Sequence, residues 1–567
     1  MKRVFSAILI MVLLIGTVAC SPTDAKKTSV EKTPQKTEAA EETTVKSEDD
    51  KKTASDEKPE ASEKTGSDKG VVLAMTAPWD SYIPFNTTSN YSDTAIDLIY
   101  DRLIFMHSDG SFSPRLADSW ERNDDYTEII FHINKNAKWH DGVPVTADDV
   151  VFTANVYSHP DISVARRSMM NLVAGTDDSG MQAKEGDIQV EALDEHTVKF
   201  KLKKPAPTDF LLSLRFREVF IIPQHIFGDK PISEILKDEA WMKPIGSGPY
   251  KYVSEISGER VELAANEDYY LGKPQFDKLV LRVVDASNLL SGLMNGEIDM
   301  VAGGESIPLD DWETAKAQDN LVTQSVKQHG YQYMTINTQK PYLTQKVRQA
   351  IDLAIDRQRI VDQLLKGEGV VAAGPISDLS PYFNEQLLPV VVDKEKAKQI
   401  LEEEKFPFDT TLLMSVPKGN LIRERSAVLI QQDLEEIGIK TEIRVVDFPT
   451  HMEVLRNGEY DLGLIGSGGP VDPSQSVLDV TPGHINNFSQ NEDPSLGEKG
   501  ALGQTKLTFE ERKAVYDEYQ LMMKEQAPFL FLYYPNILIA YNNKIENVKA
   551  EDFALRNMNI WEWTIQK

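Results

Sequence analysis

Residue types that transfer protons are present in this sequence, but they are not spaced as catalytic sets. His140 is followed by Asp141, a pair that general acid–base catalysis employs. Neighbours on a strand point to opposite faces, however, and the following Gly142 and Pro144 mark a turn. We therefore interpret His140 and Asp141 as structural residues.

Adjacent carboxylates also have a structural explanation. Such pairs occur at 148–149 and at 310–311. Acids at the start of a helix bind the free N–H groups of its first turn, and the segment TADDVVFTANVY predicts a helix capped by Thr146. No nucleophile, base and oxyanion hole are brought together by these patterns.

Familiar catalytic and cofactor motifs are missing from the sequence. GxxxxGK[ST], HExxH, GxSxG and CxxC do not occur, and the nine histidines lack metal-ligand spacing. The segments 246–248 and 466–468 read Gly-Ser-Gly but lack the third glycine of a dinucleotide fingerprint. We expect a protein that is not an enzyme and has no cofactor and no metal site.

The charge of the chain argues against a nucleic-acid-binding protein. Its 567 residues include 61 Lys+Arg and 89 Asp+Glu, which gives a formal net charge of -28 at pH 7. An acidic surface repels phosphates, so nucleic acid is not an expected partner. Hydrophobic residues at 41% and charged residues at 26% are typical of a globular protein.

The single cysteine, Cys20, lies where an exported lipoprotein carries its acyl chains. Residues 1–20 form the predicted signal peptide, with Lys2 and Arg3 before the apolar run 4–15. The sequence before Cys20 resembles a bacterial lipobox, although Thr17 replaces the usual Leu. We expect lipidation at Cys20 and an anchor on the outer face of the cytoplasmic membrane; ordinary secretion with a free thiol and a permanent membrane span are the alternatives.

Residues 21–69 are predicted to be a disordered tether. They contain no Leu, Ile, Phe, Tyr, Trp or Met, so they cannot bury enough apolar surface to offset chain entropy. The folded body is expected to begin at Gly70.

The folded body has mixed helix and strand patterns. Thr127–Ile133 and Thr197–Leu202 have the character of strands. A strand–helix–strand unit that implies a parallel sheet consists of the strand 411–416, a helical face with Ala427, Ile430, Leu434 and Ile437, a C-terminal Gly438, and the strand 439–445. Ligands collect beyond the carboxyl ends of such strands, so the loops after Val416, Val445 and Ile465 are candidates for a site.

Asp356 is placed between two predicted helices. Val347, Ile351 and Ala354 line a face before it, and the apolar residues 360–365 follow it. We interpret Asp356 as the N-cap of the second helix, which Gly367 ends.

Longer blocks of the sequence resemble a known family. The segments IDLIYDRLIF, PRLADSW and FHINKNAKWHDGVPVTADDVVFT are followed by IGSGPYKYVS, LMNGEIDMV, KVRQAIDLAIDRQRIVDQLL, IQQDLEEIGIKTEI, GEYDLGLIG with VDPS, and ERKAVYDEYQLMMKEQAPFLFLYY. In this order they are similar to the extracellular solute-binding proteins, family 5, which serve oligopeptide and dipeptide ABC transporters. The likeness covers nearly all of 70–567.

The resemblance implies an α/β fold of the periplasmic-binding-protein-like type II, with two lobes around a hinge and an additional small α+β domain. Carried onto this chain, the first lobe comprises 70–112, 246–332 and 530–567. The additional domain is then 113–245, and the second lobe 333–529.

The resemblance also implies a function. An extended oligopeptide is expected between the lobes, with its main chain paired to both, and the closed form delivers it to a membrane permease with its ATPases. A monomer is expected. The alternatives are a metal chelate or an oligosaccharide in the same fold, the latter because Trp79, Trp312, Trp561 and Trp563 have no assigned role, and a receptor for a peptide signal.

The candidate ligand contacts lie in the loop before the first helix, after the turn at 246–249, at the two crossovers between lobes and in a glycine-rich loop that permits close backbone approach. Packing is the alternative for the tyrosines. The candidates are Asn90, Tyr91, Tyr250, Tyr331, Tyr333, Asn337, Gly466, Ser467, Gly468, Gly469, Asp472, Tyr533 and Tyr534.

Asp472 marks a departure from the family pattern. Peptide-binding relatives often place a Trp and an Asp just before this element, and that Asp pairs with the amino terminus of the peptide. Here neither precedes Asp472. Either Asp472 substitutes for the missing acid, or it caps the segment that follows and no such clamp exists.

Overall fold

The computed structural model describes residues 70–87, 89–555 and 558–566. The predicted signal peptide, Cys20 and the predicted tether lie outside these residues. Among the helices of the described residues, none is both long and apolar enough to cross a bilayer.

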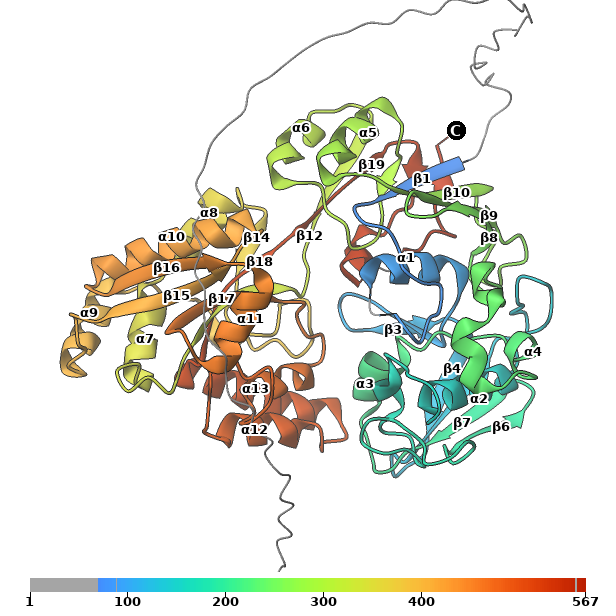
Figure 1. Ribbon diagram of the computed structural model, residues 1–567, viewed down its shortest axis with the longest axis horizontal. Helices are drawn as coiled ribbons and strands as arrows, with labels where there is room; N and C mark the ends of the chain where they lie inside the picture. The colour runs from blue at the N-terminus through green and yellow to red at the C-terminus, as the bar shows by residue number, and fades with distance from the viewer. Residues whose placement is uncertain (1–69, 88, 556–557, 567) are drawn as a thin grey trace, which may run out of the picture. The chain divides into compact units, whose positions relative to one another are not determined.

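A seven-stranded sheet is assembled from three separate stretches of the chain (Figure 1). Its order is β12-β19-β11-β1-β10-β9-β8, and β1 pairs in parallel with β10 and β11. Helices α1 (Asn90–Ile99), α5 (Leu289–Asn295) and α6 (Trp312–Lys316) belong to the same stretches. The strands are β1 (Gly70–Met75), β8 (Tyr250–Ile256), β9 (Arg260–Ala265), β10 (Lys278–Val283), β11 (Met300–Val301), β12 (Leu321–Val326) and β19 (Ile537–Asn542).

A four-stranded antiparallel sheet follows α1 in the chain, with the order β4-β5-β7-β6. The short strands β2 (Ile104–Met106) and β3 (Phe112–Pro114) precede it, and α2 (Ala147–Ser158), α3 (Thr208–Leu211) and α4 (Gln224–Phe227) accompany it. The predicted strands 127–133 and 197–202 are confirmed as β5 and β7. The four strands are β4 (Ala117–Arg122), β5 (Glu128–Ile133), β6 (Val190–Asp194) and β7 (Thr197–Lys201).

A six-stranded sheet has the order β14-β18-β13-β17-β15-β16. Its strands are β13 (Tyr331–Ile336), β14 (Gly369–Val371), β15 (Thr411–Pro417), β16 (Lys440–Val446), β17 (Leu462–Ser467) and β18 (Phe529–Pro535). Its helices are α7 (Gln345–Ala354), α8 (Arg357–Leu364), α9 (Lys394–Glu403), α10 (Leu421–Glu436), α11 (Phe448–Asn457), α12 (Ser495–Gly503) and α13 (Phe509–Gln526). Near the end of the chain, β20 (Ile545–Glu546) pairs with β21 (Thr564–Ile565).

The local predictions for this sheet are confirmed. Strands β15 and β16 are parallel and joined by α10, whose Ala427, Ile430 and Leu434 are buried, and Gly438 has a positive φ of 88°. The Asp356 carboxylate accepts a hydrogen bond from the backbone N–H of Arg359 at 2.9 Å, as an N-cap of α8 does.

Near the four-stranded sheet, the residues of the predicted helix cap and of the predicted turn also have structural roles. Asp149 accepts a hydrogen bond from the backbone N–H of Thr146 at the start of α2. The His140 ring accepts one from the backbone N–H of Gly246 at 3.2 Å, and burial lowers the pKa of His140 to about 4. A neutral, partly buried His140 thus contacts the chain at Gly246.

The hydrophobic cores divide the described residues into two lobes. One core joins the seven-stranded and four-stranded sheets, and two others cover the faces of the six-stranded sheet. The chain passes between these cores twice, from β12 to β13 and from β18 to β19; the second passage is the long red strand pair in Figure 1. Because few residues make these passages, the two lobes are joined by two short segments.

Candidate functional site

A cavity of about 360 Å³ lies between the two lobes. One wall comes from α1, from β2 and the chain just before it, from the segment after α2, and from the segment that precedes α4. The other comes from the end of β17 and the chain that follows it. The lining residues are Asp93, Asp97, Arg102, Met106, Arg166, Arg217, Glu218 and Phe220 on the first wall, and Ser467, Gly468, Gly469, Pro470, Val471, Gln475, Ser476 and Asp479 on the second.

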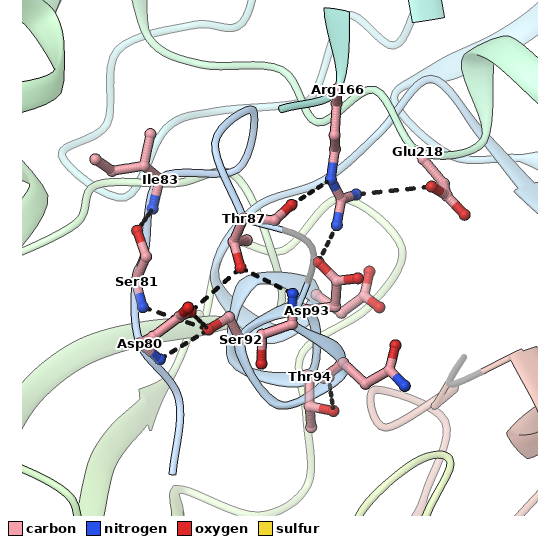
Figure 2. Close-up of polar contacts among 12 residues, drawn as sticks. Asp80, Ser81, Ile83, Thr87, Ser92, Asp93, Thr94, Arg166 and Glu218 are labelled. Carbon is pink, nitrogen blue, oxygen red and sulfur yellow. Dashed lines mark hydrogen bonds and ion pairs between the residues drawn. The ribbon is translucent and has the colours of Figure 1, made fainter. Parts of the chain in front are cut away.

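Arg166 organises one part of the first wall (Figure 2). Its guanidinium donates to the carboxylate of Asp93 on α1 and, at 2.9 Å, to the main-chain oxygen of Thr87. A third contact runs to Glu218, 3.9 Å away. Because Arg166 is buried, these acceptors replace the water that it lacks.

Arg102 organises the other part. It pairs with Asp97 of α1, donates to the main-chain oxygen of Arg217 at 2.7 Å, and lies 4.6 Å from the centre of the Phe220 ring. Burial lowers the pKa of Arg102 to about 9, so its side chain stays charged at neutral pH. Arg217 in turn pairs with Glu218 at 3.0 Å.

Ser467, the last residue of β17, and the following Gly468 and Gly469 form the first part of the second wall. Gly469 has a φ of 75°, and a Cβ there would lie 1.7 Å from the main-chain oxygen of His329. A Cβ on Gly468 would meet no atom within 4 Å. The loop is therefore held tightly against the β12–β13 passage at Gly469 and is open at Gly468.

His329 lies in that passage and touches both lobes. Its ring donates to or accepts from Ser377 at 2.8 Å, and its Nε2 lies 2.7 Å from the main-chain oxygen of Ser108. That carbonyl oxygen only accepts, so Nε2 carries the proton. Burial lowers the pKa of His329, which favours the neutral ring.

Asp472 is held by Arg512 of α13. The Arg512 guanidinium donates to the Asp472 carboxylate at 2.6 Å, and Asp472 also accepts from the backbone N–H of Ser474 at 3.0 Å. The interpretation of Asp472 as a cap is confirmed, because it starts the turn Pro473–Ser476. Asp472 is 2% exposed and lines a neighbouring apolar cavity of about 350 Å³.

Arg512 also reaches across to the other lobe. Its guanidinium pairs with Asp209 of α3, and the hydroxyl of Tyr382 donates to the same carboxylate. Burial alone would lower the pKa of Arg512, but the carboxylates of Asp472 and Asp209 outweigh that effect and raise it. We call Asp209, Tyr382, Asp472 and Arg512 the inter-lobe network.

Asp479 is the charged residue of the second wall. Burial raises the pKa of its carboxyl to about 7. Within 70–87, 89–555 and 558–566, its carboxylate forms no hydrogen bond and no ion pair. The groups that feel its charge are the phenols of Tyr331, Tyr333 and Tyr519.

The predicted glycine-rich loop lines the cavity at three of its four positions. Gly466 lies just behind it, where a Cβ would meet Gln332 and Arg423. Of the three loops that the parallel strands indicated, the one after Ile465 contributes to this cavity.

The other predicted contacts are placed elsewhere in this structure. Asn90 begins α1 with an exposed side chain, and the hydroxyl of Tyr91 lies 3.2 Å from that of Thr76. Tyr250 is fully buried and donates to the main-chain oxygen of Phe276. Asn337 donates to the main-chain oxygens of Gly458 and Tyr460 at 3.0 and 3.1 Å.

The four crossover tyrosines are packed in the second lobe. Tyr331 lies 5.5 Å from Tyr333 and 5.9 Å from Tyr534, measured between ring centres, and the hydroxyl of Tyr534 donates to the main-chain oxygen of Gly374. Tyr533 faces the opposite core. As ligand contacts these residues stay predictions, because here their rings pack against protein.

Sequence reasoning missed the whole first wall. Arg102 falls within the block IDLIYDRLIF, but Arg166, Arg217 and Glu218 carry no motif. The feature that would reveal them is the ion pair between Arg166 and Asp93, two residues that lie 73 positions apart in the sequence. A single sequence does not show such a pairing.

The comparisons with known proteins identify the class. The family described as bacterial extracellular solute-binding proteins, family 5 Middle, matches residues 111–487, which is more than half of the chain. The protein therefore belongs to this family, and it has the family's two-lobed α/β fold.

Particular relatives agree with this assignment. The oligopeptide-binding protein AppA of Bacillus subtilis is 28% identical over 85% of this chain and 90% of its own. The structure of AppA in complex with a nonapeptide matches with a TM-score of 0.67 and 27% identity, over 88% of this chain and 99% of that one. The ABC transporter substrate-binding protein CtaP of Listeria monocytogenes gives a TM-score of 0.78 with 26% identity, over 88% and 99% of the two chains. Heme-binding protein A of Haemophilus influenzae is 28% identical over 76% of this chain and 81% of its own.

The two glycines of the second wall provide a matched test. Gly469→Ala places a Cβ in the left-handed region and against His329, so we expect the free energy of unfolding to fall by about 1–3 kcal/mol. Gly468→Ala adds its Cβ to open space and should stay within about 1 kcal/mol of the wild type. Urea unfolding followed by circular dichroism measures both. Equal stability of the two variants would contradict the described loop.

Proposed function

We propose that this protein captures extended oligopeptides between its two lobes and delivers them to the permease of an ABC importer. Its family membership and its likeness to an oligopeptide-binding protein support the proposal. The observation that carries it is the cavity between the lobes, to which both contribute residues. A ligand that touches both walls favours the closed form, because its contacts are complete only there.

The second wall offers main-chain groups to such a ligand. Gly468 is exposed, and among the residues that the structure describes no hydrogen bond forms to its N–H or C=O. Peptide groups of the ligand find partners there without any requirement on their side chains. Val471 lines both this cavity and the apolar one beside it, which supports an extended ligand rather than a compact one.

The proposed domains follow from the two passages of the chain. From the sequence, the lobe boundaries were expected at 332–333 and at 529–530. We propose to move both, so that the first lobe comprises 70–112, 246–328 and 536–567, the additional domain 113–245, and the second lobe 329–535. The last boundary is set after Pro535 because β18 pairs with β13 and β14 of the six-stranded sheet. In this division Asp209 belongs to the additional domain and Arg512 to the second lobe.

The sequence before Gly70 completes the proposal. Signal cleavage before Cys20 and acylation of its thiol would anchor a monomeric protein on the outer face of the cytoplasmic membrane, with 21–69 as the tether. Binding and release need no bond to be made or broken, so the protein is proposed to act without enzymatic activity and without a cofactor.

Two other ligands are alternatives to a peptide, and the binding experiment below distinguishes them. The name of the Haemophilus relative makes haem the second candidate, and Met106 is the residue of the lining that resembles an axial haem ligand. An oligosaccharide needs an aromatic platform, but of the described tryptophans Trp79, Trp312, Trp561 and Trp563 none lines the cavity. A signalling role would use the same bound peptide and a different membrane partner.

Native mass spectrometry of the protein purified without denaturation tests the proposed cargo. We expect co-purifying peptides of mixed sequence, because the recognition is of the main chain. A discrete mass of haem, a metal chelate or a sugar in place of peptides would contradict it. Boiled and extracted samples of the same preparation control for contaminants.

The inter-lobe network allows closure itself to be tested. Asp209→Asn removes one carboxylate from Arg512 in the closed form and leaves Asp472 in place. We expect peptide affinity to fall roughly three- to tenfold, about 0.6–1.4 kcal/mol, because Asp209 is partly exposed. Titration calorimetry with co-purified peptide measures the change, and Asp161→Asn, an exposed acid near α2, is the matched control. Unchanged affinity in Asp209→Asn would show that the network does not stabilise the closed form.

A further inference from the structure

His329 is a buried imidazole in the β12–β13 passage, one of the two segments that join the lobes. The residue is 3% exposed and lines neither of the two neighbouring cavities. Its Nε2 lies 2.7 Å from the main-chain oxygen of Ser108 in the first lobe, and its Nδ1 lies 2.8 Å from the hydroxyl of Ser377 in the second. Each ring nitrogen therefore contacts a different lobe.

The contact with the first lobe is made by the turn between β2 and β3. Ser108 lies in this turn, and so does Gly110, which packs against the second lobe. A Cβ on Gly110 would lie 3.3 Å from Pro381 and 3.4 Å from Val471. The turn covers His329 while the lobes are together, so separation of the lobes would expose the ring to water.

The two hydrogen bonds require a neutral ring with its proton on Nε2. That proton is donated to the Ser108 oxygen, so Nδ1 keeps its lone pair and accepts from the Ser377 hydroxyl. A second proton, on Nδ1, would force this hydroxyl to turn away, and in the described part of the chain it has no other hydrogen-bond partner. It would also place a positive charge where the ring has lost its water.

The charged groups around the ring do not offset this cost. Asp378 favours a protonated ring, but its carboxylate lies 2.5 Å from the ammonium of Lys327. The guanidinium of Arg217 disfavours it. Burial has the largest effect, and on balance the pKa of His329 is lowered.

The remaining charges on the elements that pack against His329 are engaged elsewhere. In the β2–β3 turn, His107 lies 3.1 Å from Asp552, and the carboxylate of Asp109 accepts hydrogen bonds from within the turn. In the chain after β17, Asp472 pairs with Arg512 at 2.6 Å. None of these pairs supplies a counter-charge for a protonated ring.

Resting on the proposed function, we propose that His329 is a proton-sensitive positioning residue whose neutral form favours closure, so that protonation of this ring promotes release of the bound peptide. In the open form the ring regains water and the ordinary pKa of about 6.5. The open form then binds a proton that the closed form excludes. The stabilisation of the closed form is complete above about pH 6.5 and is lost, by up to about tenfold per pH unit, as the pH falls below that value.

Asp479 titrates in the opposite sense and must be separated from His329. Burial raises the pKa of its carboxyl to about 7 in the closed form, so acid favours closure through this group. Wild type and His329→Gln share Asp479 and the other titrating groups. A pH dependence in the ratio of their dissociation constants therefore belongs to His329.

Titration calorimetry on the full chain measures this ratio, with a synthetic copy of one co-purified peptide that has no ionisable side chain. Glutamine keeps a donor near the position of Nε2 and takes up no proton. We expect the Kd of wild type relative to His329→Gln to stay constant from about pH 8 to pH 7 and to rise roughly five- to thirtyfold by about pH 5. At about pH 6, binding should release roughly half to one proton more in wild type, read from the heats in buffers of different ionisation enthalpy.

Two further variants make the outcomes decisive. His107→Gln changes a histidine of the same turn that contacts Asp552 and Ser113 instead of the passage, and it should keep the wild-type pH profile. Ser377→Asp offers a protonated ring a carboxylate and should reduce the acid effect, so it carries the same test if His329→Gln does not fold.

A ratio that stays constant over the whole pH range, in whichever of His329→Gln and Ser377→Asp is folded, overturns the inference while peptide binding stands. An acid effect that disappears in His107→Gln and persists in His329→Gln does the same. If folded wild type binds the peptide at no pH, the proposed function falls and the inference with it.

Discussion

The guanidinium of Arg512 is enclosed by protein, and a buried cation must be surrounded by acceptors. Asp472 satisfies it within the second lobe, and the main-chain oxygen of Gly503 lies 3.3 Å from its Nε. The remaining acceptors are the hydroxyl of Tyr382, at 2.7 Å, and the carboxylate of Asp209, which belongs to the other lobe. Arg512 therefore holds the segment that forms one wall of the cavity, and it stabilises the contact with the opposite lobe.

The two walls have complementary tasks. On the first wall Arg102 and Arg166 form ion pairs with Asp97 and Asp93 of α1, which neutralise most of the local charge and tie α1 to the neighbouring segments. On the second wall Gly468 exposes its main chain, and the partly buried carboxyl of Asp479 lines the cavity. We propose that an extended ligand bound between such walls is recognised by its backbone. Recognition of this kind would tolerate broad variation in the side chains of the ligand.

Much of the second lobe was predictable from local patterns. The β15–α10–β16 unit, the Asp356 cap and the glycine loop after β17 all follow from periodicity and turn chemistry over a few residues. The crossover tyrosines were harder, because an aromatic pair at the end of a strand suits a ligand platform and a core equally. The rings of Tyr331 on β13 and Tyr534 on β18 pack on each other because these two strands are neighbours in the sheet. The sequence alone does not show that the two strands are neighbours. Asp479 carries no sequence signal, since its place in the cavity wall depends on the tertiary structure.

The movement of the two lobes is the central claim, and a distance measured across them tests it most directly. Spin labels at Asp124→Cys and Asp362→Cys, both exposed and placed on opposite lobes, would be introduced in a Cys20→Ala chain. Double electron–electron resonance before and after addition of co-purified peptide reports the separation. The account predicts a broad, longer distribution without peptide and a narrow, shorter one with it. One identical distribution in both samples, with peptide shown to be bound, would contradict closure around the ligand.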